Sequence, residues 1–150
     1  MLFKTHLAFG FLAGLLALNI FNPANVILFF TLVLIGSILP DIDHPKSKIG
    51  RKIKIIGFLF EHRGFFHSLL FLIFLYIFSV LLFKNNSFIL PLFIGYSSHL
   101  FIDSFNHLGI MPLHPLSRFR IKGFVKTGAL AETMLFFGLV AIDIWKLLNL

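Results

Sequence analysis

Five long apolar segments, separated by short polar breaks, make up most of this chain. They cover residues 7–21, 24–39, 65–83, 88–102 and 129–145. A helix needs about 20 apolar residues to cross a bilayer, with a range of about 17–25. The third segment meets that length; Leu2 and Phe3 lengthen the first, while the second and fourth are short. We therefore expect an all-α polytopic membrane protein, with about five transmembrane helices forming a single domain over residues 1–150.

The composition agrees with lipid as the surrounding medium. Hydrophobic residues make up 58% of the chain and charged residues 13%, whereas soluble domains carry about 25% charged residues. The chain has no cysteine, so disulfides and thiolate metal ligands are excluded.

The basic residues predict the orientation, because cytoplasmic loops of membrane proteins are enriched in Lys and Arg. With the N-terminus inside, only Lys84 and Lys146 of the 13 basic residues lie outside. We expect a protein of the cell (inner) membrane, with its N-terminus in the cytoplasm and its C-terminus outside. The sequence Asn22-Pro23-Ala24-Asn25 is a poor cleavage site, so we expect the first helix to be retained.

Two predicted cytoplasmic loops mix basic and apolar residues, over residues 49–60 and 118–122. Such segments lie in the membrane interface and favour anionic lipids, which are the expected partners. Alternatively, these charges serve only to set the topology. The distribution of the net charge of +7 along these loops argues against nucleic acid as a partner.

Histidines and carboxylates concentrate in four short segments, at residues 5–6, 39–45, 61–68 and 99–103. In the predicted topology all four reach the cytoplasmic end of the bundle. Imidazoles and carboxylates at one depth are the donors of which metal sites are made. The sequence therefore predicts a polar site at that end.

Two of the helices carry candidate ligands on a face of small residues. His99 and Asp103 are four residues apart, as are Gly95 and His99. The first helix repeats this spacing with His6, Gly10 and Gly14. Small residues let membrane helices approach closely, so both stripes should face the bundle interior. For His6, a hydrogen-bonded packing role is the alternative to metal ligation.

The turn between Pro40 and Pro45 holds Asp41, Asp43 and His44. The prolines prevent a helix from continuing, so we expect an extended turn at a helix end. The two acids can act as one ligand and one base, or as ligands of two ions. A capping turn is the alternative, but it needs only one Asp.

A second polar turn contains His62, Arg63, Gly64 and His67, with His67 expected at the start of the third helix. Gly64 allows the backbone to turn, so that His62 can approach the same centre as His67. Arg63 suits a phosphate or carboxylate oxygen, or it is simply a topology-setting charge.

Weaker candidates lie further along the chain. His107 continues the face of His99 and Asp103, provided that the helix extends so far. Glu132 is either a ligand or an acid at a helix N-terminus. The predicted metal ligands are His6, Asp41, Asp43, His44, His62, His67, His99, Asp103, His107 and Glu132.

Taken together, residues 39–44, residues 62–68 and His99 to Asp103, followed by Gly109, resemble the YdjM-like family. The resemblance covers nearly the whole chain. It implies an inner-membrane metal-dependent hydrolase.

The order of these residues also resembles zinc-dependent phospholipase C and related nucleases, all-helical enzymes with three zinc ions. That resemblance implies ligand roles for His6, His67, His99, Asp103 and His107, and places Asp41 or Asp43 near the attacking water. The N-terminal tryptophan ligand is missing, and Gly128 replaces the histidine of the later His-x3-Glu pair that would end at Glu132. These departures favour two ions over three.

From these patterns we predict hydrolysis of a phosphoester in a lipid or lipid-linked substrate. One to three divalent ions would activate water, with zinc favoured by the histidines and manganese allowed by the carboxylates. Asp41, Arg63 and His62 are the expected catalytic residues.

The main alternatives are a metal transporter and a non-catalytic scaffold stapled by metal. Transporters place polar groups near the bilayer midplane in repeated halves, whereas the middles of these five segments are apolar. A structural metal site needs about four ligands, fewer than the chain offers. Neither His-x-x-His-His nor His-Glu-x-x-His occurs, which argues against di-iron oxidases and zinc proteases.

Overall fold

The structure is a computed structural model that describes residues 1–43, 64–82 and 86–150. It contains five α-helices, so the predicted number and the all-α class are confirmed for these residues. The helices are α1 (Phe3–Phe21), α2 (Val26–Ile38), α4 (Leu69–Leu82), α5 (Asn86–Ser104) and α6 (Leu130–Leu148). Two short 3₁₀ helices, η1 (Leu39–Asp43) and η3 (Phe65–His67), precede and follow the undescribed segment 44–63.

The break between α1 and α2 lies at the predicted position. Asn22 ends α1 in the left-handed conformation, with φ of 38°, and Pro23 follows it. Asn25 then begins α2, because its side-chain oxygen accepts a hydrogen bond from the Leu28 N–H at 2.9 Å. These caps stabilise a tight reversal between the two helices.

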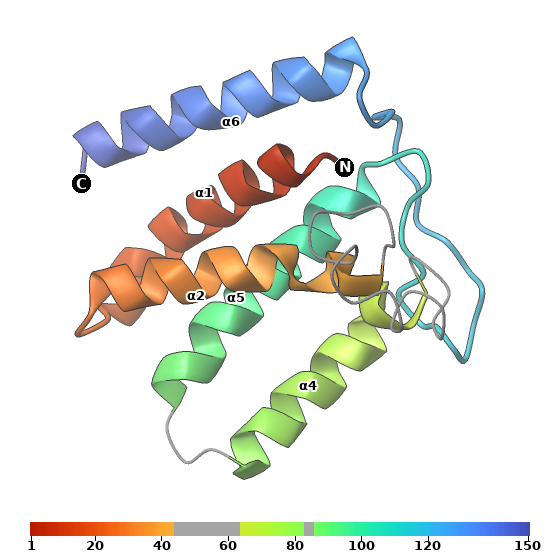
Figure 1. Ribbon diagram of the computed structural model, residues 1–150, viewed down its shortest axis with the longest axis horizontal. Helices are drawn as coiled ribbons and strands as arrows, with labels where there is room; N and C mark the ends of the chain where they lie inside the picture. Colours follow the sequence, from red (N-terminus) through yellow and green to blue (C-terminus); the bar gives the residue numbers. More distant parts are fainter. Residues whose placement is uncertain (44–63, 83–85) are drawn as a thin grey trace.

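The centre of the molecule is formed by α1, α2 and α5, which all contact one another. Glycines bring α2 and α5 together: a Cβ at Gly95 would lie 1.9 Å from the Val33 carbonyl oxygen, and one at Gly36 would lie 2.3 Å from that of Leu92. Helix α6 packs on α1 and α4 packs on α5, at opposite sides of this centre (Figure 1). The predicted inward direction of the small-residue faces is thus confirmed.

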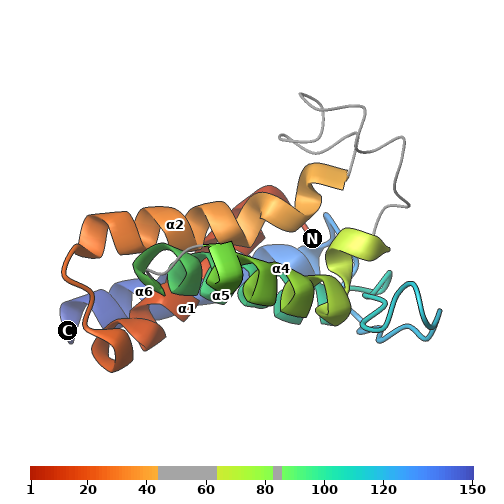
Figure 2. The same cartoon turned by 90° about the horizontal axis from the view of Figure 1, so that it is seen from below.

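The two ends of the bundle differ in character. The N-terminus, η1, η3 and the segment after α5 lie at one end, and the C-terminus lies at the other (Figures 1 and 2). Residues 105–129 fold against this first end. Their isolated bridges join Asn106 to Val125 and Ile110 to Ile121.

Three local predictions are wrong. The third apolar segment was expected to be the full-length span, but its helix covers only Leu69–Leu82. His67 precedes that helix in η3, because the chain turns at Ser68, whose side chain accepts from the Phe71 N–H. The turn after α2 is a 3₁₀ helix through Pro40 rather than an extended segment.

Among the described residues, α1 alone is both long and apolar enough to cross a membrane by these criteria. Helix α4, α2 continued to Ile42, and Phe88–Ser104 are apolar but shorter. Large apolar side chains remain exposed along α4 and α6, such as Leu81 at 79% and Leu148 at 81%. Such surfaces are unfavourable in water and suited to lipid.

Candidate metal centre

Five predicted ligands meet at the polar end of the bundle. His6 comes from α1, Asp41 from η1, His67 from η3, and His99 and Asp103 from α5. The four other than Asp41 are 0–1% exposed. The Asp41 side chain is 15% exposed, so it is the member of this cluster nearest to solvent.

Asp41 and Asp103 each direct one carboxylate oxygen toward the Nε2 atoms of His67 and His99. The Nε2 atoms of His67 and His99 are 3.2 Å apart. Asp41 Oδ1 lies 3.9 Å from each of them, and Asp103 Oδ2 lies 3.9 Å from His67 and 4.0 Å from His99. Tetrahedral zinc binds nitrogen and oxygen at about 2.0–2.2 Å, which separates its ligand atoms by roughly 3.3–3.6 Å. The residues therefore fit a divalent ion after small shifts.

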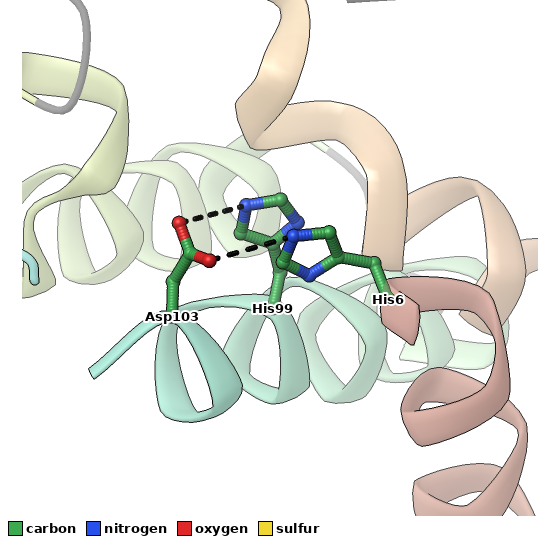
Figure 3. Close-up of side chains that lie close together, drawn as sticks. All are labelled: His6, His99 and Asp103. Carbon is green, nitrogen blue, oxygen red and sulfur yellow. Dashed lines mark ion pairs between the residues drawn. The ribbon is translucent and has the colours of Figure 1, made fainter. Parts of the chain in front are cut away.

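His6 extends the cluster on the other side of Asp103. Its Nε2 lies 3.5 Å from Asp103 Oδ1, and its ring stacks on His99 with centroids 3.8 Å apart (Figure 3). Neither ring nitrogen of His6 has a hydrogen-bond partner among the described residues, although both are buried. A buried polar atom without a partner is costly, and a metal ion would relieve that cost.

The orientation of His99 is set by the backbone of α2. His99 Nδ1 lies 2.7 Å from the Ser37 carbonyl oxygen. Because a carbonyl can only accept, Nδ1 carries a proton, and a neutral His99 ring then has its lone pair on Nε2, which faces the cluster. Ser37 lies in the last turn of α2, and Gly95 brings that turn against α5.

Asp103 connects two groups of ligand atoms. His6, His99 and Asp103 form one group, and Asp41, His67 and His99 form the other. Oδ1 of Asp103 faces His6, while Oδ2 faces His67 and His99. The amino group of Met1 also lies 2.7 Å from Oδ1. This arrangement offers two neighbouring positions for a cation.

Two predicted ligands lie outside both groups. Helix α5 ends at Ser104, and His107 beyond it has an exposed side chain. Glu132 is fully buried, but its carboxylate accepts from the Leu2 N–H at 2.5 Å, the Thr5 hydroxyl at 3.1 Å and the Gly128 N–H at 2.6 Å. It thus joins α1 to the start of α6, which agrees with the alternative of a helix N-terminal acid.

Four predictions lie outside what the structure describes. They concern His44, His62, Arg63 and the side chain of Asp43. Sequence reasoning also missed Ser37, because its contribution is a backbone carbonyl and no side-chain pattern marks it. Pro40, three residues later, was the available signal, since it has no N–H to donate to a carbonyl in the preceding turn.

Comparisons with known proteins agree with the membrane setting. The sequence matches the family described as YdjM inner membrane protein over residues 1–148. The chain belongs to the YdjM family. The resemblance stated from the sequence is thereby confirmed at the level of this family, whose description is that of an inner membrane protein.

Two relatives illustrate the similarity. The uncharacterized protein YvsG of Bacillus subtilis (strain 168) is 33% identical over 141 residues, which are 91% of this chain and 88% of YvsG. Inner membrane protein YdjM of Escherichia coli (strain K12) is 33% identical over 120 residues, 72% of this chain and 61% of that protein. No solved structure matches the chain.

Proposed function

We propose that the chain is a membrane-embedded, metal-dependent hydrolase that cleaves a phosphoester bond of a lipid or lipid-linked substrate. The observation that supports this most is the convergence of three imidazoles and two carboxylates, one of them partly exposed, at one end of an apolar bundle. Helical packing alone does not require such a costly set of buried polar groups.

In this proposal His6, Asp41, His67, His99 and Asp103 hold one or two divalent ions. Histidine-rich ligation favours zinc, and the carboxylates allow manganese. The ion would supply Lewis acidity and bring the pKa of a bound water toward neutrality.

The residues of the chain divide the remaining tasks. Asp41, the least buried member of the cluster, accepts the proton of the attacking water. Asp103 and His99 lie in the buried centre and position the other groups. Arg63 stabilises negative charge on the phosphoryl group and His62 assists it, as predicted from the sequence.

A metal-stapled scaffold is the second candidate, because four of the five clustered side chains are almost fully buried. Closed, four-coordinate sites are typical of structural metals. A transporter is less well supported, since the cluster lies at one end of the bundle rather than at its middle.

The first test is the metal content of protein purified in detergent. We expect bound zinc or manganese in the wild type and its loss in His99→Ala, with no change in the control His107→Ala. Lack of metal in the wild type, even after incubation with zinc or manganese, would contradict the proposal.

The second test separates an enzyme from a scaffold. The metal-loaded wild type should hydrolyse a phospholipid or a soluble phosphodiester, and Asp41→Asn should lose the activity. Bound metal without hydrolysis of phosphomonoesters, phosphodiesters or phospholipids would favour the scaffold.

A further inference from the structure

An apolar cavity of about 670 Å³ lies between α4 and α5. Leu72, Leu75 and Ser79 of α4 face Leu92 and Tyr96 of α5 across it. The Ser79 hydroxyl donates a hydrogen bond to the Leu75 carbonyl oxygen. It therefore offers no free polar donor to the cavity at this point. The lining is therefore suited to hydrocarbon.

One end of this cavity lies beside the metal-ligand cluster. Leu39, which lines it, lies two residues before Asp41 in η1. Tyr96 lines it as well and lies on α5 one helical turn before His99. The Tyr96 hydroxyl donates to the Phe66 carbonyl, next to His67. The cavity is thus lined by residues of η1 and α5, the elements that carry Asp41, His99 and Asp103.

The length of the cavity suits one leaflet of a bilayer. Its α4 lining runs from Leu72 to Leu82, which is about 15 Å of helix at 1.5 Å per residue. That distance is half of a hydrocarbon core about 30 Å thick. Its volume lies within the range of roughly 300–1,000 Å³ found for pockets that hold small ligands.

We propose that this cavity binds one hydrocarbon chain of the substrate, a phospholipid whose phosphate lies at the metal-ligand cluster. The inference rests on the proposed function and specifies its substrate class. A lipid of the adjacent leaflet reaches both parts without leaving the bilayer, with its chain between α4 and α5 and its head group at Asp41.

The test uses the full chain in nanodiscs of phosphatidylcholine that contain phosphatidylglycerol with a diazirine at the end of one acyl chain. After illumination, mass spectrometry locates the cross-links. We expect them to concentrate on residues 75–82 and 88–92. Cross-links spread evenly over the exposed faces of α4 and α6 would overturn the proposal.

Ser79→Trp fills the cavity, and Val80→Trp is its matched control, because Val80 is 41% exposed and does not line the cavity. Ser79→Trp should lose the cavity cross-links and keep those on α6, while Val80→Trp keeps both. Leu92→Trp fills the cavity from α5 if Ser79→Trp does not accumulate. Unchanged labelling in a folded cavity-filling variant would also overturn the proposal.

Metal content and hydrolysis of a soluble phosphodiester distinguish this inference from the proposed function. Ser79→Trp should keep its bound metal and its hydrolysis of the soluble phosphodiester, and should lose only phospholipid hydrolysis. If the wild type shows no hydrolysis at all, the cross-links still report whether the cavity holds a chain. If Ser79→Trp instead changes the oligomeric mass and leaves the labelling intact, a second copy of the chain occupies the cavity and the inference is wrong.

Discussion

His99 and His6 differ in how many ligand atoms surround them. His99 belongs to both groups of ligand atoms, and the Ser37 carbonyl determines which of its nitrogens faces them. His6 belongs to one group, and neither of its ring nitrogens has a hydrogen-bond partner among the described residues. The two histidines should therefore differ in their effect on bound metal.

We expect His6→Ala to lose part of the bound metal and His99→Ala to lose all of it. The group of Asp41, His67 and His99 remains intact without His6, whereas both groups need His99. Metal analysis of the two purified variants beside the wild type measures the difference. Equal loss in both variants would indicate a single ion that depends on all five ligands.

Glu132→Ala should destabilise the protein without removing metal. Leu2, Thr5 and Gly128 would each lose the acceptor of a hydrogen bond, and a buried group left unsatisfied costs about 1–3 kcal/mol. Thermal unfolding in detergent, followed by circular dichroism, measures the loss, with the neighbouring Thr133→Ala as control. Loss of metal from folded Glu132→Ala would instead support the prediction that Glu132 is a ligand.

Among the secondary-structure elements, α2 and α5 are the pair on which the cluster depends most. Their close approach at Gly95 places the last turn of α2 where the Ser37 carbonyl meets His99. The contact between these two helices is therefore a condition for the geometry of the cluster.

Gly95→Ala should weaken metal binding although Gly95 is not a ligand. A Cβ there would lie 1.9 Å from the Val33 carbonyl oxygen, so the two helices must separate. Overpacking of this kind costs about 1–3 kcal/mol. Gly138→Ala is the control, since nothing lies within 4 Å of its added Cβ. Titration with zinc compares the two variants, and equal affinities would show that the α2–α5 contact does not set the His99 geometry.

The elements also show how far the sequence was informative. Hydrophobic runs and the break at Asn22-Pro23 predicted five helices, and the four-residue spacing predicted which faces of α1 and α5 point inward. The limits of α4 were missed and the end of α5 relative to His107 was left open, because apolar composition does not distinguish a helix from the turns that flank it. Glu132 was ambiguous, since its partners are backbone groups that no residue pattern marks.

At the scale of the whole molecule, the N-terminus and the C-terminus lie at opposite ends of the helical bundle. This arrangement agrees with the odd number of membrane spans expected from the sequence. Most basic residues fall within the sequence ranges 46–63 and 118–126, and the orientation is a prediction from their charge alone. The absence of cysteine allows a direct measurement of that orientation.

Single cysteines should react from opposite sides of the membrane. Phe119 is 64% exposed in the loop at the polar end, and Asn149 is exposed at the other end. In intact spheroplasts, a membrane-impermeant maleimide should label Asn149→Cys but not Phe119→Cys, which should react only after permeabilisation. The reverse pattern would place the metal-ligand cluster outside the cytoplasm.

The wide separation of the clustered side chains in the sequence has a consequence for biosynthesis. His6 leaves the ribosome long before Asp103, and His99 follows only with α5. The imidazole of the first helix therefore has no cluster to join until α5 has been synthesised. Truncated nascent chains that end before residue 99 should be recognised by quality-control proteases, and chains that have passed it should become resistant as the bundle closes.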